Sequence, residues 1–334
     1  MRKALITGGG GFVGQNIVRQ LRARDVQCLV VGRHLYPDVE ALGAVCRQGD
    51  ICDRDFMREC CQGMDTVFHV AALAGIWGRW RDYYATNVLG TENVLAGCRA
   101  AGVSRLIYTS TPSVVFNQQS ICNGDEQLPY AEWFLCHYAR SKAIAEQLIL
   151  AASGRNLRTC AIRPHLVWGP GDPHLIPRLI ERGRKGQLRQ VGAGQNLVDI
   201  SYVDNVAYAH LLAADNLAGA GTAAGRAYFV SQGVPVNLWQ WIGELFSRLD
   251  ITPVRAKISY PAAYSIGALL EGVYGLAGWQ QEPPMTRFLA QQLAKSHYFS
   301  IARARHDLGY QPLVSTEQGM ERLLASLTTS LTTK

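Results

Sequence analysis

The stretch TGGGGFVGQNIV (residues 7–18) decides how the rest of this sequence is interpreted. It follows a short apolar run, KALIT (3–7), and leads into an amphipathic helical pattern. Gly8, Gly11 and Gly14 let the backbone turn tightly and approach a pyrophosphate, whose charge the helix N-terminus can meet. Glycine turns also occur for packing alone. The position between a strand and a helix nevertheless predicts dinucleotide binding.

Around this stretch, the first 165 residues alternate short apolar runs with amphipathic patterns such as GQNIVRQLRA (14–23) and TENVLAGCRAAG (91–102). Runs of this kind, bounded by turn residues, predict strands. They are KALIT (3–7), VQCLVV (26–31), GAVCRQG (43–49), TVFHVA (66–71), SRLIYTS (104–110) and RTCAIRP (158–164). Strand, helix and strand at this spacing imply right-handed crossovers. We therefore predict an α/β fold with a Rossmann-like doubly wound parallel sheet, whose ligands bind beyond the carboxyl ends of the strands.

The pattern changes after residue 165, where GPGDPHLIP (169–177) is rich in turn residues and helices then mix with short strands. YFVS (228–231) is the one later run expected to return to the sheet. The predicted nucleotide-binding Rossmann domain covers 1–165 with 196–232 returning to it, and the predicted smaller C-terminal substrate lobe covers 166–195 and 233–334.

The end of the second predicted strand, VVGRH (30–34), indicates which dinucleotide binds. A site for NAD usually places a carboxylate there, which accepts hydrogen bonds from the ribose hydroxyls. Here Gly32 stands in that place and Arg33 follows it. A guanidinium without a competing carboxylate suits a 2′-phosphate, although a solvent-exposed loop arginine is the plain alternative. We therefore expect NADP(H) to be favoured over NAD(H).

Asp50, in GDICD (49–53), either meets the adenine amino group or caps a helix that starts near Asp53. Other expected cofactor contacts follow the strand ends and the glycine loop. The full predicted set is Gly8, Gly11, Phe12, Val13, Gly14, Arg33, Asp50, Ile51, Ala71, Ala72, Tyr138, Lys142 and Pro164.

HYARSK (137–142) places Tyr138 and Lys142 one helical turn apart, so both side chains lie on one face. Such a pair is common on ordinary helices, but this one follows a strand that ends in the hydroxyls of YTSTPSVVF (108–116) and so faces the same crevice as the glycine loop. Reduction of a carbonyl needs a proton for the forming alkoxide, and a phenol near an ammonium can supply it. Thr111 would then orient the substrate oxygen, and Asn87 would hold Lys142 through a water.

These residues resemble the extended short-chain dehydrogenase/reductase family, whose pattern combines T-G-x-x-G-x-x-G, a strand ending in a hydroxyl, and Y-x-x-x-K. IRPHLVWGPGDPHLIPRLIE (162–181) and DLGYQPLV (307–314) are similar to its 3-beta-hydroxysteroid dehydrogenase branch. Within it, the likeness is greatest to bacterial 2-alkyl-3-oxoalkanoate reductases and sterol-4-carboxylate 3-dehydrogenases. The resemblance implies that Tyr138 is the proton donor or acceptor, and that Lys142 binds the nicotinamide ribose and lowers the phenol's pKa. The family's hydroxyl is usually Ser, so Ser110 and Ser113 are alternatives to Thr111.

The resemblance implies a ketone or secondary alcohol on a hydrophobic 3-oxo or 3-hydroxy acid, with a 3-beta-hydroxysteroid or a sterol carboxylate as the alternative. The apolar helical stretch 261–279 and the basic stretch 178–189 would fit such an amphipathic acid. The expected substrate contacts are Trp77, Thr111, His165 and Trp168. A sugar-nucleotide epimerase is a further alternative, but the acid it usually has after the second strand is missing. A dehydratase would want an acid where Pro112 stands.

The composition limits the cellular compartments and the classes of binding partner that we expect. The nine cysteines are odd in number and scattered without a C-x-x-C, which fits neither a disulfide framework nor a zinc site, so no metal is expected. No leader-like pattern precedes the first run, and we expect a cytoplasmic protein. The net charge of +7 comes without a basic stripe or module typical of nucleic-acid binding. The stretch 261–279 is too interrupted to span a membrane but leaves peripheral membrane contact open. A homodimer is expected.

Overall fold

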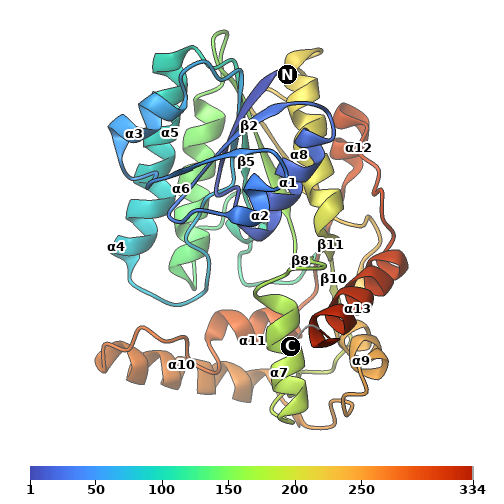
Figure 1. Cartoon of the computed structure of the whole chain (residues 1–334). Helices are drawn as coiled ribbons and strands as arrows, with labels where there is room; N and C mark the ends of the chain where they lie inside the picture. The colour runs from blue at the N-terminus through green and yellow to red at the C-terminus, as the bar shows by residue number, and fades with distance from the viewer. Residues whose placement is uncertain (333–334) are drawn as a thin grey trace.

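The structure is a computed structural model and describes residues 1–332. Within these residues, a parallel sheet of seven strands has the order β12-β7-β5-β4-β1-β2-β3 (Figure 1). The strands are β1 (Lys3–Thr7), β2 (Gln27–Gly32), β3 (Val45–Gln48), β4 (Thr66–His69), β5 (Arg105–Thr109), β7 (Arg158–Pro164) and β12 (Arg226–Val230). Each run predicted as a strand before residue 165 overlaps one of them, which confirms the predicted Rossmann-like doubly wound sheet.

Helices cover both faces of this sheet (Figure 1). On one face lie α1 (Phe12–Arg22), α2 (Pro37–Glu40), α8 (Val203–Ala218) and α12 (Ala302–Leu308). On the other lie α3 (Arg54–Cys60), α4 (Trp80–Tyr83), α5 (Gly90–Ala101) and α6 (His137–Ala151), with a π-helix, η1 (Tyr84–Leu89), that joins α4 to α5. Because both faces are covered, the inner strands are largely apolar instead of alternating apolar with polar residues, whereas the edge strand β3 is mostly exposed and includes Arg47 and Gln48.

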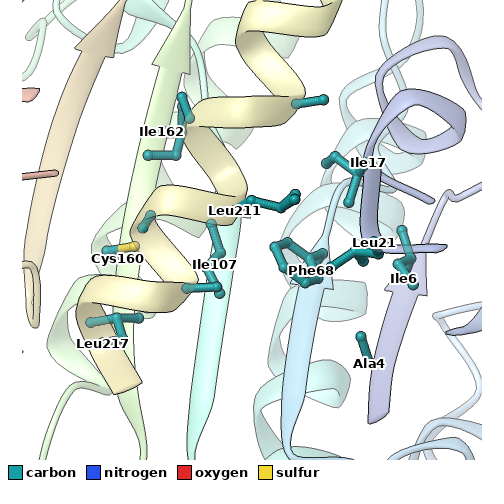
Figure 2. Close-up of a cluster of buried hydrophobic side chains, with 14 of the residues drawn as sticks. Ala4, Ile6, Ile17, Leu21, Phe68, Ile107, Cys160, Ile162, Leu211 and Leu217 are labelled. Carbon is teal, nitrogen blue, oxygen red and sulfur yellow. The ribbon is translucent and has the colours of Figure 1, made fainter. Parts of the chain in front are cut away.

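Successive side chains of a strand point to opposite faces, and the two cores divide accordingly. Ala4 and Ile6 of β1 pack beneath α1 and α8, together with Phe68, as Figure 2 shows. Leu5, between them in sequence, packs instead against the α3 and α5 side of the sheet. Each core side chain of this size contributes about 1.5–3 kcal/mol through its burial, which holds the helices and the strand ends in register.

The strand order reverses at β1, which pairs with β2 on one side and with β4 on the other. The loops that leave these strands therefore separate and open a crevice at the carboxyl edge of the sheet. The segments after β1, β4 and β5, together with the start of α6, all reach this edge. These segments contain the glycine loop and the HYARSK stretch.

The smaller lobe is built on a sheet of order β13-β10-β15-β6 and on two short strand pairs, β11 with β8 and β14 with β9. Its strands are β6 (Ile121–Gly124), β8 (Val167–Trp168), β9 (Gln190–Val191), β10 (Leu197–Val198), β11 (Ser201–Tyr202), β13 (Val236–Asn237), β14 (Lys257–Ile258) and β15 (His297–Phe299). Its helices are α7 (Leu175–Arg184), α9 (Leu238–Arg248), α10 (Tyr260–Leu276), α11 (Arg287–Ala294) and α13 (Thr316–Thr332). β6 comes from the segment between β5 and α6, so the chain contributes to the lobe's sheet before residue 165. A 3-10 helix, η2 (Pro112–Val114), starts that segment.

Candidate active site

The glycine loop between β1 and α1 is shaped to receive an anion. Gly8 has a left-handed φ of +67°, and a Cβ on Gly14 would lie 2.2 Å from the Gly8 carbonyl oxygen, so larger residues do not fit these two positions. Gly11 is the N-cap residue of α1 and has no side chain to accept hydrogen bonds from the first turn. The N–H groups of that turn are therefore left for a ligand, and the helix dipole favours a negative one. This geometry fits a dinucleotide pyrophosphate.

A cavity of about 450 Å³ runs from this loop to the start of α6. It brings together nearly all the residues predicted to contact the cofactor. Those lining it are Gly8, Gly11, Phe12, Val13, Gly14, Arg33, Asp50, Ile51, Ala71, Ala72, Tyr138 and Lys142. Pro164, the last residue of β7, is not among the lining residues. Sequence reasoning missed Tyr36 and Thr86, which also line the cavity, and it named Ser110, another lining residue, only as an alternative hydroxyl.

Tyr36 explains why Gly32 stands at the end of β2. A Cβ on residue 32 would lie 2.5 Å from the Tyr36 hydroxyl oxygen, so the phenol occupies the space of the side chain that Gly32 lacks. Arg33 is exposed at the same end of the cavity. An arginine and a phenol at this end provide hydrogen-bond donors, and β2 itself ends without a carboxylate. Sequence reasoning could have found Tyr36, because it is an aromatic residue shortly after the end of a predicted strand.

Asp50 does not cap the helix that follows it. Asp53 is the N-cap of α3 and accepts a hydrogen bond from the Phe56 N–H at 3.0 Å. One Asp50 oxygen, Oδ1, accepts from the Cys52 N–H at 2.9 Å, and the residue lines the cavity. Of the two roles predicted for Asp50, the capping one therefore belongs to Asp53.

Tyr138 and Lys142 lie in the first two turns of α6, both on the cavity wall. Lys142 is almost fully buried, with 1 % of its surface exposed. Its Nζ donates a hydrogen bond to the Thr109 carbonyl oxygen at 2.6 Å and lies 4.0 Å from the centre of the Tyr108 ring. The end of β5 thus holds the ammonium in place.

Burial has the largest effect on the pKa of both Lys142 and Tyr138. It lowers the pKa of Lys142 to about 7, although the Glu146 carboxylate opposes this shift. It raises the pKa of the Tyr138 phenol, and a hydrogen bond with the Thr111 side chain acts in the opposite direction. In the protein alone, the phenol's pKa is therefore raised, whereas the family resemblance implied that Lys142 lowers it. The physical reason is that the phenol is withdrawn from water, so lowering by Lys142 stays a prediction for the protein with its cofactor.

Thr111 is the hydroxyl that reaches Tyr138. It begins η2, is buried, donates to the Ser113 Oγ at 3.2 Å, and accepts from the Ser113 N–H at 3.2 Å. Ser110, the neighbouring alternative, lines the nucleotide cavity, and its Oγ has no hydrogen-bond partner among the described residues. The contact with the phenol favours Thr111 as the hydroxyl beside the reacting oxygen.

Asn87 lies in the π-helix η1, a rare geometry that is frequent at functional sites. Its Nδ2 donates to the Ser141 Oγ at 2.9 Å, and its Oδ1 accepts from the Leu73 N–H at 2.7 Å. The Ser141 Oγ in turn donates to the Tyr138 carbonyl oxygen at 2.8 Å. Asn87 thus orients the first turn of α6 through Ser141, beside Lys142. Its predicted link to Lys142 through a water stays a prediction.

A buried chain of hydrogen bonds extends this network to β1. Thr91 donates to the Asn87 carbonyl oxygen at 2.7 Å, so its oxygen accepts from the His69 Nε2–H at 2.9 Å. The His69 Nδ1 then accepts from the Thr7 hydroxyl at 2.8 Å. Burial, followed by the charge of Lys142, lowers the pKa of His69 to about 3, which keeps the ring neutral. Sequence reasoning missed this chain because a lone histidine in an apolar strand indicates no partner.

A second, larger cavity of about 980 Å³ adjoins the start of α6. Trp77 lines it, as predicted for a substrate contact, together with His137 and the α10 residues Glu271 and Tyr274. The Arg79 and Arg287 guanidinium groups supply positive charge in its wall, although Arg287 is paired with Glu271 at 2.6 Å.

Three of the four predicted substrate contacts do not line this cavity. Thr111, at the N-cap of η2, is buried and lines neither cavity, and the other two lie in the smaller lobe. Trp168 is fully buried in the core of the smaller lobe, where its ring meets Trp241 edge-on at 5.3 Å. His165 is buried, and its Nε2 lies 2.6 Å from the Nδ1 of His297 on β15. The structure therefore brings neither side chain to the wall of the larger cavity. Both follow a strand end in sequence, but the lobe folds over them.

Comparison with known proteins shows which family this chain matches. Residues 5–261 match the model of the 3-beta hydroxysteroid dehydrogenase/isomerase family. A 2-alkyl-3-oxoalkanoate reductase of Stenotrophomonas maltophilia is 46% identical, over 97% of this chain and 99% of its own. A mouse sterol-4-alpha-carboxylate 3-dehydrogenase, decarboxylating, is 34% identical, over 97% of this chain and 91% of its own. The solved structure of MoeE5 in complex with UDP-glucose and NAD superimposes with a TM-score of 0.75 at 25% identity, covering 98% of this chain and 99% of that one.

Proposed function

The chain belongs to the 3-beta hydroxysteroid dehydrogenase/isomerase family, whose members are NAD(P)-dependent oxidoreductases that act on CH–OH groups, and from this premise we propose that it reduces the ketone of a hydrophobic 3-oxo acid with NADPH. The observation that carries the proposal is the position of the start of α6. Tyr138 lines the nucleotide cavity, while its neighbours Cys136 and His137 line the larger cavity. The phenol therefore stands where a hydride donor and a large substrate would meet.

A nicotinamide cofactor, when bound, supplies the hydride that reaches the carbonyl carbon. The Tyr138 hydroxyl donates a proton to the carbonyl oxygen as negative charge develops on it. The Thr111 hydroxyl, in contact with the phenol, holds that oxygen in line. Lys142, fixed by the Thr109 carbonyl, lies where its amino group can bind the nicotinamide ribose. Because burial raises the phenol's pKa, Tyr138 stays protonated near neutral pH and is ready to act as the acid.

The size and lining of the larger cavity support a substrate with an apolar tail and an acidic head. Ile76, Trp77, Phe134 and Leu135 give it apolar wall, and about 980 Å³ is room for a long chain. Arg79, whose Nε donates to Gln280 at 3.2 Å and lies 3.8 Å from an Asp82 carboxylate oxygen, has terminal nitrogens that could bind a carboxylate. The basic stretch 178–189 does not line this cavity, so the predicted role for it in holding the acid has no support.

The alternatives are a 3-beta-hydroxysteroid or a sterol carboxylate, and the same cavity would admit a flat ring system. The relatives named as 2-alkyl-3-oxoalkanoate reductases are 45–46% identical, against 34% for the mouse sterol-4-alpha-carboxylate dehydrogenase, which favours the acyclic acid. A sugar-nucleotide epimerase is the further alternative. Gly32, in place of an acidic residue at the end of β2, argues against it.

Preference for NADPH is tested by Arg33→Ala. We expect this change to weaken NADPH binding by roughly 1.5–3 kcal/mol, the scale of a hydrogen bond to a charged group, because Arg33 would hold the 2′-phosphate. NADH affinity should stay nearly unchanged, which makes NADH the internal control. Fluorescence titration of both cofactors measures the effect. Equal losses for the two cofactors would contradict the 2′-phosphate assignment.

Substrate class is tested by a chain-length series of 2-alkyl-3-oxo acids. Burial of a methylene contributes about 0.8 kcal/mol, so four added methylenes should improve kcat/KM by about 3 kcal/mol, or roughly 150-fold. Ala268→Asp, which puts a charge into the cavity wall on α10, should flatten this dependence. Ala262→Asp, the same change on the exposed side of α10, is the matched control. A flat series with the unaltered enzyme, or faster turnover of a 3-oxosteroid or a sugar nucleotide, would refute the acyclic acid.

A further inference from the structure

The Glu271–Arg287 ion pair joins two helices of the smaller lobe, α10 and α11, which pack against each other (Figure 1). Gly267 of α10 permits the close approach, because a Cβ at this position would lie 2.6 Å from the Thr286 carbonyl carbon and 2.7 Å from the Arg287 nitrogen. Glu271 follows Gly267 by one helical turn and so faces the same backbone. Its Oε1 accepts a hydrogen bond from the Arg287 N–H at 2.7 Å, and its Oε2 accepts one from Nε at 2.6 Å. The carboxylate therefore holds the arginine at its backbone and at its side chain.

This arrangement fixes a guanidinium group in the wall of the larger cavity, which Arg287 lines. A guanidinium has five N–H donors in a rigid fork, and Glu271 takes one of them. The Tyr264 side chain forms a further hydrogen bond with the group. Other donors of the fork remain for a ligand, and the fork matches the two oxygens of a carboxylate. Arg287 is thus a preorganised receptor for a carboxylate.

The ion pair lies beside the residues that lead into Tyr138. Cys136, two residues earlier, lines the same cavity as the pair. Burial raises the pKa of the Cys136 thiol, and the charge of the Glu271 carboxylate adds to the rise, which places this carboxylate near the thiol. Phe288, next to Arg287 in sequence, packs in the same apolar cluster as Cys136 and Tyr138. The guanidinium therefore stands in the part of the cavity that adjoins the reacting phenol.

The other basic side chains of this cavity are less suited to hold an acid there. Arg79 is 59% exposed, against 40% for Arg287, and it donates to Gln280, which follows the C-terminal end of α10. Burial, followed by the charge of Arg140, lowers the pKa of His137, so this ring is mostly uncharged at neutral pH. Arg287 is left as the fixed cation beside the phenol.

We propose that Arg287, held by Glu271, binds the carboxylate of the 3-oxo acid that Tyr138 protonates, and that it makes the enzyme selective for acids. This inference rests on the proposed function and identifies the group that recognises the head of the substrate. In a 3-oxo acid, a single carbon separates the ketone carbon from the carboxylate carbon, so the carboxylate has to lie beside the phenol. A guanidinium at this place binds the acid and also fixes the ketone for hydride transfer. The apolar wall of the cavity is then left for the tail.

The test compares a 2-alkyl-3-oxo acid with its methyl ester, which has the same ketone and tail but no charge. We expect the unaltered enzyme to prefer the acid. Arg287→Gln should lower kcat/KM for the acid by roughly 10- to 150-fold, the effect of losing a hydrogen bond to a charged group, and leave the ester nearly unchanged. Arg287→Gln with Glu271→Gln should show the same loss, because the missing guanidinium causes it and not a carboxylate left without its partner.

Arg226→Gln is the matched control, because it breaks an ion pair of similar exposure elsewhere. Arg226 lies 3.1 Å from Asp307, and their side chains are 52% and 7% exposed, against 40% and 11% for Arg287 and Glu271. Neither residue of the control pair lines the nucleotide cavity or the larger cavity. Its preference for the acid over the ester should equal that of the unaltered enzyme. Unchanged thermal unfolding shows that the variants fold.

Binding without turnover gives a second measurement. Calorimetry should show that the 2-alkyl-3-hydroxy acid binds the NADPH-loaded enzyme more tightly than its methyl ester does, and Arg287→Gln should remove this difference. The inference is overturned if the unaltered enzyme treats acid and ester alike, if Arg287→Gln lowers both to the same extent or neither, or if the double variant regains the preference. Loss of the acid alone in Arg79→Gln, without such a loss in Arg287→Gln, would assign the head to Arg79 instead. Absence of turnover with both compounds would refute the proposed reaction and this inference with it, and is distinct from the other outcomes, in which the ketone is reduced.

Discussion

Tyr138→Phe is expected to lower kcat for ketone reduction by on the order of 10²-fold or more, because the ring stays and only the proton donor is lost. The ring packs in the cluster that holds Val114 and Phe229, so the variant should fold normally. Cofactor affinity should be retained, since Lys142 keeps its bond to the Thr109 carbonyl. Stopped-flow reduction at saturating cofactor, with titration of the cofactor alone, separates the two effects.

The pH dependence of turnover tests the role of the Tyr138 phenol independently. Because burial raises the phenol's pKa, ketone reduction should hold its rate through neutral and mildly alkaline pH, where the phenol remains protonated. Alcohol oxidation needs the phenolate and should rise over that range. Thr111→Val is the matched comparison, because it removes the neighbouring hydroxyl and leaves the donor in place. Normal turnover by Tyr138→Phe would return HYARSK to an ordinary helix start.

Arg163→Met is expected to lower the free energy of unfolding by about 3–5 kcal/mol, the usual cost of leaving one partner of a buried ion pair alone. Arg163 of β7 donates to Glu146 of α6 from Nε at 3.0 Å and from a terminal nitrogen at 2.5 Å. Their side chains are 4% and 0% exposed. The Tyr130 hydroxyl adds a third hydrogen bond to Glu146 at 2.6 Å. Urea unfolding measures the loss.

A double-mutant cycle distinguishes the ion pair from simple packing. Adding Glu146→Leu to Arg163→Met removes the stranded carboxylate and should recover much of the lost stability. Glu146 lies one helical turn after Lys142 and raises the pKa of that ammonium, so the double variant should also weaken cofactor binding. Additive losses from the two single changes would show that the pair contributes nothing beyond its separate contacts.

Much of the fold could be predicted because it depends on local patterns. The six runs expected as strands before residue 165 each overlap a strand of the parallel sheet, because strands that are covered on both faces are largely apolar. Gly8, Gly11 and Gly14 predict the turn, because larger residues do not fit at Gly8 and Gly14. Tyr138 and Lys142 share a wall because one helical turn separates them.

The smaller lobe was less predictable because its strands are short and pair across long distances. β6 and β15 are paired although more than 170 residues separate them, and neither has a strong pattern of its own. Trp168 and His165 follow a strand end, as substrate contacts do, yet the lobe core and His297 enclose them. The Thr7–His69–Thr91–Asn87 chain joins four elements, and no spacing in the sequence indicates it.

By itself, the sequence determined the doubly wound sheet, the glycine loop and the tyrosine–lysine pair, because each depends on residues within one strand, turn or helix. Only the tertiary structure decided what surrounds them. It placed Tyr36 against Gly32, Arg163 against Glu146, and several large apolar residues of α10 on the outside. The physical reason is that turn geometry and hydrophobic periodicity act locally, whereas burial, charge pairing and exposure depend on which distant segments the fold brings together.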